Sequence, residues 1–191
     1  EEIREVVEEC GIPLAYTNDL TTMTPRSDVF AEKGFLKITL DFPVVRRTDI
    51  MHPHEVKFIA TKKHLLTIHF EDIEAIHKFS QEFEVSGLIT QAKKSASGAH
   101  ICMSLLDHMY KNMTVKLDYL ETKLNDIEEK VFQGKEREMV SELSHLSRRL
   151  IMFRQTLHSH NIALNDLESM AIKAFGKSFA APVELLRDEY D

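Results

Sequence analysis

The chain has 191 residues and a net charge of −7; 43% of its residues are hydrophobic and 29% are charged. This is an ordinary soluble globular composition, long enough for one sizeable core or two small ones. The negative charge argues against a nucleic-acid partner and favours attraction of cations, and no apolar stretch approaches the roughly 20 residues that cross a bilayer.

The N-terminal segment predicts a short helix followed by a turn-rich segment. Residues 2–10 carry apolar side chains on one helical face, and Gly11 and Pro13 then end the helix. Residues 14–34 are polar and turn-rich, and they include the turn signal Thr24-Pro25-Arg26.

The next segments predict strands. In FLKITLDFPVV, residues 35–45, apolar and polar residues alternate, which is typical of a half-buried strand. In EVKFIATKKHLLTIHFED, residues 55–72, two apolar runs flank the polar connection 61–64, which predicts a β-hairpin. Asp72 can cap a helix whose apolar residues are Ile73, Ile76 and Phe79.

From about residue 96 the apolar residues recur every three or four positions, which predicts long helices. The pattern is interrupted at 133–135, around Gly134, and resumes to Leu157, so we expect an antiparallel helical hairpin. We expect a third, separate helix at 161–175 and a final helix beginning near Pro182. A small αβ unit followed by a long-helix unit indicates the α+β class.

The two cysteines, Cys10 and Cys102, form no CxxC motif. With no visible signal peptide, we expect both to be reduced and buried in a cytosolic chain.

The ten histidines raise the question of a metal site. The nearest pairs are His52 with His54 and His158 with His160. The second pair lies on different helical faces, and nothing adjacent completes a ligand set around the first. We therefore interpret these residues as ordinary surface histidines. The sequence also has no HExxH, GxSxG or Gly-rich phosphate loop, so it does not predict an enzyme.

The carboxylates are the remaining candidates. Asp188, Glu189 and Asp191 lie at the end of the final helix, and Asp19 lies in the turn-rich segment. By themselves these acids do not distinguish a cation site from a solvated surface.

The order of these pieces resembles the CorA family of divalent-cation transporters and its zinc-transporting relatives. GIPLAYTNDLTTMTPRSDVF is similar to the family's helix, acidic turn and proline-containing approach to a strand. GFLKITLDFPV and EVKFIATKKHLLTIHF resemble the strand and hairpin that follow, and LLRDEYD resembles the run into the family's stalk helix.

The resemblance implies an α/β/α sandwich-like sheet unit at 1–94, truncated at its N-terminus. A long helical hairpin at 95–176 would pack on it, and 177–191 would begin the stalk helix. The chain lacks an initiator Met and a helix stop, so we expect a fragment without the transmembrane spans. The full-length protein would contact the membrane only through those spans.

The implied function is that of a cytoplasmic regulatory domain in a pentameric divalent metal ion transporter or channel of the cell (inner) membrane. Mg²⁺, Co²⁺ and Zn²⁺ are the implied ions, with no organic cofactor. Asp19 and Asp188, from neighbouring copies, would hold an inter-subunit regulatory cation. This chain has Asn18 where the family commonly has an acidic residue. The fragment alone can be monomeric.

Two alternatives stay open at this stage. The chain could be a free-standing adaptor whose helical hairpin binds a partner, although a Met and Leu seam at this spacing is more often intramolecular core. A metal-dependent enzyme would need convergent histidine ligands that the sequence does not suggest. The identity of the ion and the direction of transport are not readable, because selectivity belongs to the pore.

Overall fold

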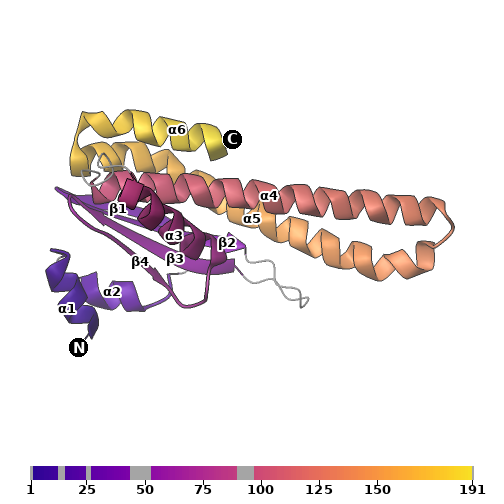
Figure 1. The fold of residues 1–191 in the computed structure, drawn as a ribbon. Coiled ribbons are helices and arrows are strands. Elements are labelled where there is room, and N and C mark those ends of the chain that lie inside the picture. The colour runs from indigo at the N-terminus through magenta and orange to yellow at the C-terminus, as the bar shows by residue number, and fades with distance from the viewer. Residues whose placement is uncertain (1, 13–15, 25–26, 44–52, 90–96, 191) are drawn as a thin grey trace.

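The structure is a computed structural model that describes residues 2–12, 16–24, 27–43, 53–89 and 97–190. A four-stranded antiparallel sheet is covered on one face by long helices and on the other by two short N-terminal helices (Figure 1). The predicted α+β class and the layered sheet unit are therefore confirmed.

The strands follow each other in space as they do along the chain, in the order β1-β2-β3-β4. They are β1 (Asp28–Glu32), β2 (Phe35–Pro43), β3 (Pro53–Thr61) and β4 (Leu65–His69). The predicted hairpin is confirmed: its turn closes through the Thr61 N–H, which donates to the carbonyl of His64 at 2.9 Å.

The polar segment before β2 contains two elements that the sequence did not predict. Its first part forms the one-turn helix α2 (Thr17–Thr21), and its end forms β1. The strand escaped prediction because only Val29 and Ala31 of its five residues are fully buried. Gly34, at a φ of +81°, closes the turn into β2.

The expectation that β2 is half-buried is wrong. Its polar residues Lys37 and Thr39 are as buried as its apolar ones. The reason is tertiary: α1 (Glu2–Glu9), α2 and the segment that follows them lie over the face that alternation assigns to solvent (Figure 1).

The helical hairpin is confirmed. It consists of α4 (Gly98–Phe132) and α5 (Glu136–Phe175), and Gly134 between them has a φ of +83°. The third helix expected at 161–175 is not separate, because α5 runs through it without a break. No Gly or Pro interrupts residues 157–161, so nothing ends the helix there.

Three further helical elements complete the fold. α3 (Glu74–Ile89) follows the sheet, and a short 3₁₀ turn, η3 (Lys177–Phe179), leads into α6 (Ala180–Tyr190). α6 packs along α4 and α5 on the side away from the sheet (Figure 1).

The core is divided by the sheet. The main cluster lies between one sheet face and the helices α4, α5 and α6, and includes Leu36, Phe58, Leu105 and Leu167. A second, smaller cluster lies under the N-terminal helices and consists of Val7, Ile12, Leu20, Phe35 and Ile59. Since Leu20 belongs to α2, this small cluster fixes part of the segment that carries Asp19.

Candidate functional site

Asp19 lies in the middle of α2, and its side chain is outside the described part of the structure. The helix is held from inside by Leu20, which is fully buried in the small N-terminal cluster. It is closed by the hydroxyls of Thr21 and Thr22, each of which donates to the carbonyl of Asn18 at 3.1 Å. These contacts hold α2, and with it the backbone of Asp19, against the sheet.

Asp188 lies on α6 and is exposed. The opposite side of this helix is anchored by Val183 and Leu186, both buried, and by the Tyr190 hydroxyl, which donates to the carbonyl of Leu157 at 2.6 Å. This anchoring on α4 and α5 leaves the carboxylate of Asp188 directed to the surface.

Two grooves flank α6, and Asp188 borders both. One, of about 530 Å³, lies against α4 and includes Asp107, Lys111 and Glu189 in its lining. The other, of about 350 Å³, includes Glu168 and Glu184. The surface around Asp188 thus carries several carboxylates, whose oxygens are the ligands that a hard cation prefers, together with the cationic side chains of Lys111 and Arg187.

Of the two further acidic candidates, Glu189 and Asp191, the structure describes Glu189. Glu189 is half-buried, and its charge helps to raise the pKa of Lys111, although the main cause is the hydrogen bond at 2.9 Å from Lys111 to Asp107. Asp191 lies outside the described residues.

One copy of the chain does not bring Asp19 and Asp188 together. α2 lies on one side of the sheet and α6 on the far side of the α4–α5 layer (Figure 1). A cation that contacts both carboxylates must therefore lie between two copies. Within the described residues, no group of three or more His, Cys, Asp or Glu side chains is arranged to hold a metal.

The interpretation of the histidines is partly wrong. His158 is exposed as predicted, but His160, two residues along the same helix, is completely buried. Its Nε2–H donates to the carbonyl of Asp41 at 2.7 Å, and its Nδ1 accepts the hydroxyl of Tyr110 at 3.1 Å. Burial lowers the pKa of His160 to about 4, so the ring is neutral. His52 lies outside the described residues, and His54 is half-buried.

The prediction that the cysteines are buried is correct for Cys102 and wrong for Cys10. Both are free thiols, and Cys102 is fully buried, which raises its pKa to about 12. Cys10 is only half-buried because it follows the last turn of α1 at the edge of the small cluster.

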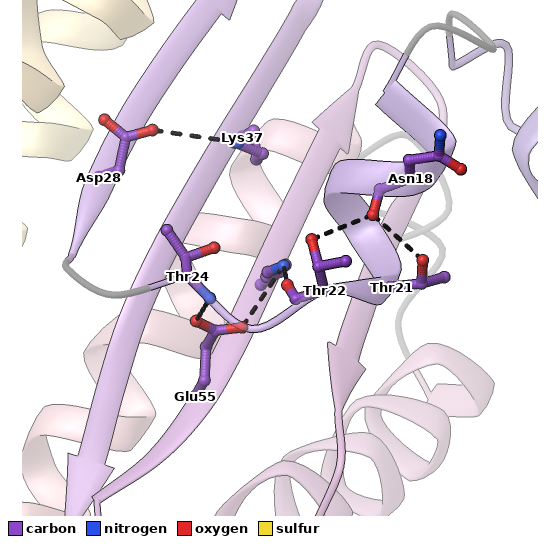
Figure 2. Close-up of polar contacts among 8 residues, drawn as sticks. Asn18, Thr21, Thr22, Thr24, Asp28, Lys37 and Glu55 are labelled. Carbon is purple, nitrogen blue, oxygen red and sulfur yellow. Dashed lines mark hydrogen bonds and ion pairs between the residues drawn. The ribbon is translucent and has the colours of Figure 1, made fainter.

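Sequence reasoning missed a buried ion pair that contacts the segment after α2. Lys57 and Glu55 project from β3 on the face toward α2, and their Nζ and Oε1 atoms are 3.4 Å apart. Figure 2 shows Glu55 beneath Thr24, close to the polar contacts of Thr21 and Thr22 with Asn18. The signal was the alternation of Glu55 and Lys57 with apolar neighbours on a strand, which alone suggests exposure rather than a role.

The pair also affects a neighbouring acid. Asp41 lies opposite Glu55 across the β2–β3 ladder. Partial burial, and then the charge of Glu55, raise the pKa of Asp41. Both carboxylates line a small cavity of about 110 Å³ between this face and the segment that covers it.

None of the helices in the described part of the chain has the length and apolar character needed to span a membrane.

Comparison with known proteins identifies one family and several solved structures with the same fold. Residues 1–189 match the profile of the family described as CorA-like Mg²⁺ transporter protein. Among curated proteins, none matches this chain.

Three solved structures share the fold. The complete structure of the CorA magnesium transporter from Methanocaldococcus jannaschii has a TM-score of 0.76 at 20% identity; the match covers 99% of this chain and 58% of that one. The soluble domain of the same CorA has a TM-score of 0.77 at 20% identity and is covered over 74% of its length, against 99% here. The full-length CmaX protein has a TM-score of 0.75 at 14% identity, with 98% of this chain and 57% of that one covered. The chain thus spans less than two thirds of the two full-length proteins.

Proposed function

Because this chain belongs to the family of CorA-like Mg²⁺ transporter proteins, we propose that it is the cytoplasmic regulatory part of a divalent-cation transporter or channel of the cell membrane. The family match over residues 1–189 carries this proposal. The transported ion is Mg²⁺ or a related divalent cation such as Co²⁺ or Zn²⁺, and transport belongs to the assembled, full-length protein, a homo-pentamer.

The regulatory site lies between copies. The carboxylate of Asp188 on one copy and that of Asp19 on its neighbour share a divalent cation. The arrangement of the elements supports this proposal, because Asp188 is exposed on α6 while α2 is on the opposite side of the molecule. Mg²⁺ keeps several of its waters and typically takes only one or two carboxylates, so the two residues suffice as protein ligands.

The ion acts by neutralising repulsion. Two carboxylates about 4 Å apart repel by roughly 1 kcal/mol in water and about 4 kcal/mol near a protein surface. Around a ring of copies these contributions add, so bound cation favours the closed, symmetric arrangement and its loss favours an open one. The domain thereby senses the cytosolic cation concentration and gates the pore.

The test is calorimetric titration of the purified, assembled protein with Mg²⁺. Asp19→Asn and Asp188→Asn should each weaken binding about tenfold or more, because each removes one of the two charged ligands of a hard cation. Glu128→Gln is the matched control: it removes one exposed carboxylate near the tip of the hairpin and should leave binding unchanged. Unaltered affinity in both Asp variants would refute the regulatory site.

The family match favours this proposal over the adaptor hypothesis. A simple measurement separates the two: a transporter loads Mg²⁺, Co²⁺ or Zn²⁺ into vesicles that contain the full-length protein, whereas an adaptor does not.

A further inference from the structure

The strongest unassigned feature of the molecule is the buried ion pair between Lys57 and Glu55. Lys57 is completely buried and Glu55 is 8% exposed, on a face of β3 where Thr39 and Asp41 of β2 lie opposite them and Ile59 is the next residue on that face. A buried ion pair contributes little net stability, since the desolvation of both charges offsets their attraction. We therefore ask which part of the chain the side chains of Lys57 and Glu55 hold in place.

Both members of the pair contact the same short piece of backbone. The Nζ of Lys57 donates to the carbonyl of Thr22, and the Oε2 of Glu55 accepts the N–H of Thr24 at 2.5 Å. Lys57 and Glu55 are two residues apart on β3, and Thr22 and Thr24 are two residues apart on the segment after α2. The two pairs therefore match, with Lys57 donating to Thr22 and Glu55 accepting from Thr24. Charged partners in a buried environment make such hydrogen bonds strong. We call this arrangement the β3 clamp.

The β3 clamp lies directly beside α2. Thr22 is the residue after the helix, and its hydroxyl donates to the carbonyl of Asn18, as does that of Thr21 (Figure 2). The carbonyl that Lys57 holds and the hydroxyl that closes α2 therefore belong to one residue, three positions from Asp19. A one-turn helix has little stability of its own, so its position depends on such anchors.

We propose that Lys57 and Glu55 are positioning residues for the inter-subunit cation site: the β3 clamp fixes α2 on the sheet so that Asp19 is presented to the neighbouring copy. This inference rests on the proposed function, because it assigns Asp19 to the cation. Neither residue touches the ion. Each acts through the backbone of Thr22 and Thr24.

The first test addresses the clamp without any metal. In Lys57→Met, which keeps the length of the side chain and removes its donor, the amides of residues 18–24 should exchange with solvent at least about tenfold faster, because their local opening becomes easier. Lys37→Met is the matched control. Lys37 is also a buried lysine on this sheet face, but its ion pair, at 3.9 Å, is with Asp28 of β1. Equal exchange of 18–24 in the wild type and Lys57→Met would overturn the clamp.

The second test measures Mg²⁺ affinity calorimetrically in the assembled protein. We expect a loss of about fivefold or more in Lys57→Met, in the range of ordinary coupling between sites. Lys57→Arg, which can still donate to Thr22, should recover most of the affinity. Glu55→Gln retains an acceptor for Thr24 and should lose less than Lys57→Met; it also serves as the second variant if Lys57→Met does not fold.

The outcomes separate the two proposals. If Asp188→Asn weakens Mg²⁺ binding and neither clamp variant does, the positioning role is wrong and the proposed function stands. If neither Asp19→Asn nor Asp188→Asn changes binding, the proposed regulatory site fails, and the positioning role fails with it. If Lys57→Arg binds Mg²⁺ as weakly as Lys57→Met does, a purely structural effect explains the loss of affinity, and the positioning role is again rejected.

Discussion

Among single residues, His160 shows how burial and hydrogen bonding determine the protonation state of a side chain. Its ring uses both nitrogens: one donates to the backbone of the sheet at Asp41, and the other accepts from Tyr110 on α4. A carbonyl can only accept, so the neutral form with the proton on Nε2 is the one that satisfies both bonds. Protonation would add a charge in a dry site and break the bond to Tyr110.

This arrangement predicts a pH dependence of stability. Because the pKa of His160 is lowered from 6.5 to about 4, the stability that it contributes is complete above pH 6.5 and is lost as the pH falls toward 4. The shift corresponds to about 3 kcal/mol of unfolding free energy. Denaturant unfolding between pH 7.5 and 4 should show this loss in the wild type and a flatter dependence in His160→Gln.

His158→Gln is the control, since His158 is exposed on the same turn of α5. Its pH dependence should follow the wild type. A wild type and a His160→Gln variant with parallel pH profiles would show that the buried ring does not titrate in this range.

At the scale of elements, the start of α4 depends on close contact with the β3–β4 turn. A Cβ atom added at Gly98 would lie 2.0 Å from the carbonyl oxygen of His64, which is backbone and cannot move away cheaply. Ser97 precedes it as the N-cap, its hydroxyl accepting the N–H of His100 at 3.4 Å. Gly98 therefore lets the 35-residue helix begin against the sheet.

This contact reverses the usual helix preference. Ala is favoured over Gly in a helix by about 1 kcal/mol, yet Gly98→Ala should destabilise the chain by about 1–3 kcal/mol, the usual cost of overpacking. Thermal unfolding followed by circular dichroism measures the change. Asn125→Ala, at an exposed position of the same helix, should be neutral or slightly stabilising. An unchanged or higher melting temperature in Gly98→Ala would contradict the close contact.

At the scale of the whole molecule, stability should be graded along the helical hairpin. Near the sheet, α4 and α5 share the main cluster with β2, β3 and α6, so this part should unfold together with the sheet. Beyond the sheet (Figure 1), few side chains are buried, namely Leu120, Ile127, Met139 and Leu146, and Phe132 is 82% exposed. The predicted boundary at residue 94 between an αβ unit and a helical hairpin stays a prediction. The main cluster contains residues from both sides of this boundary.

Native-state hydrogen exchange measures this gradient. Amides of residues 119–150 should exchange at least about tenfold faster than those of 102–113 and 160–174, because fewer buried contacts oppose their opening. Equal protection along both helices would indicate that the distal part is stabilised by contacts other than those within one copy.

Much of the fold was predictable from the sequence, but only part of the candidate site. The β2, β3 and β4 strands and the α4–α5 hairpin carry periodic apolar patterns and a Gly turn, so they were predictable locally. β1 and α2 are short, and each buries few side chains, so their formation depends on the sheet and core beneath them. Asp19 and Asp188 were identified through family resemblance, whereas Lys57 and Glu55 were not, because a polar residue on a strand does not show what covers it.

The local pattern of residues specifies which segments become helices and long strands, because periodicity and turn residues act within a few positions of each other. Three other properties come from the packing of distant segments: the polar face of β2 and β3 is covered, His160 is buried and neutral, and α2 and α6 lie on opposite sides of one copy. These properties depend on burial by residues distant along the chain. Local sequence patterns do not show which residues are buried in this way. Burial by distant residues determines how costly a charge is and where a carboxylate lies.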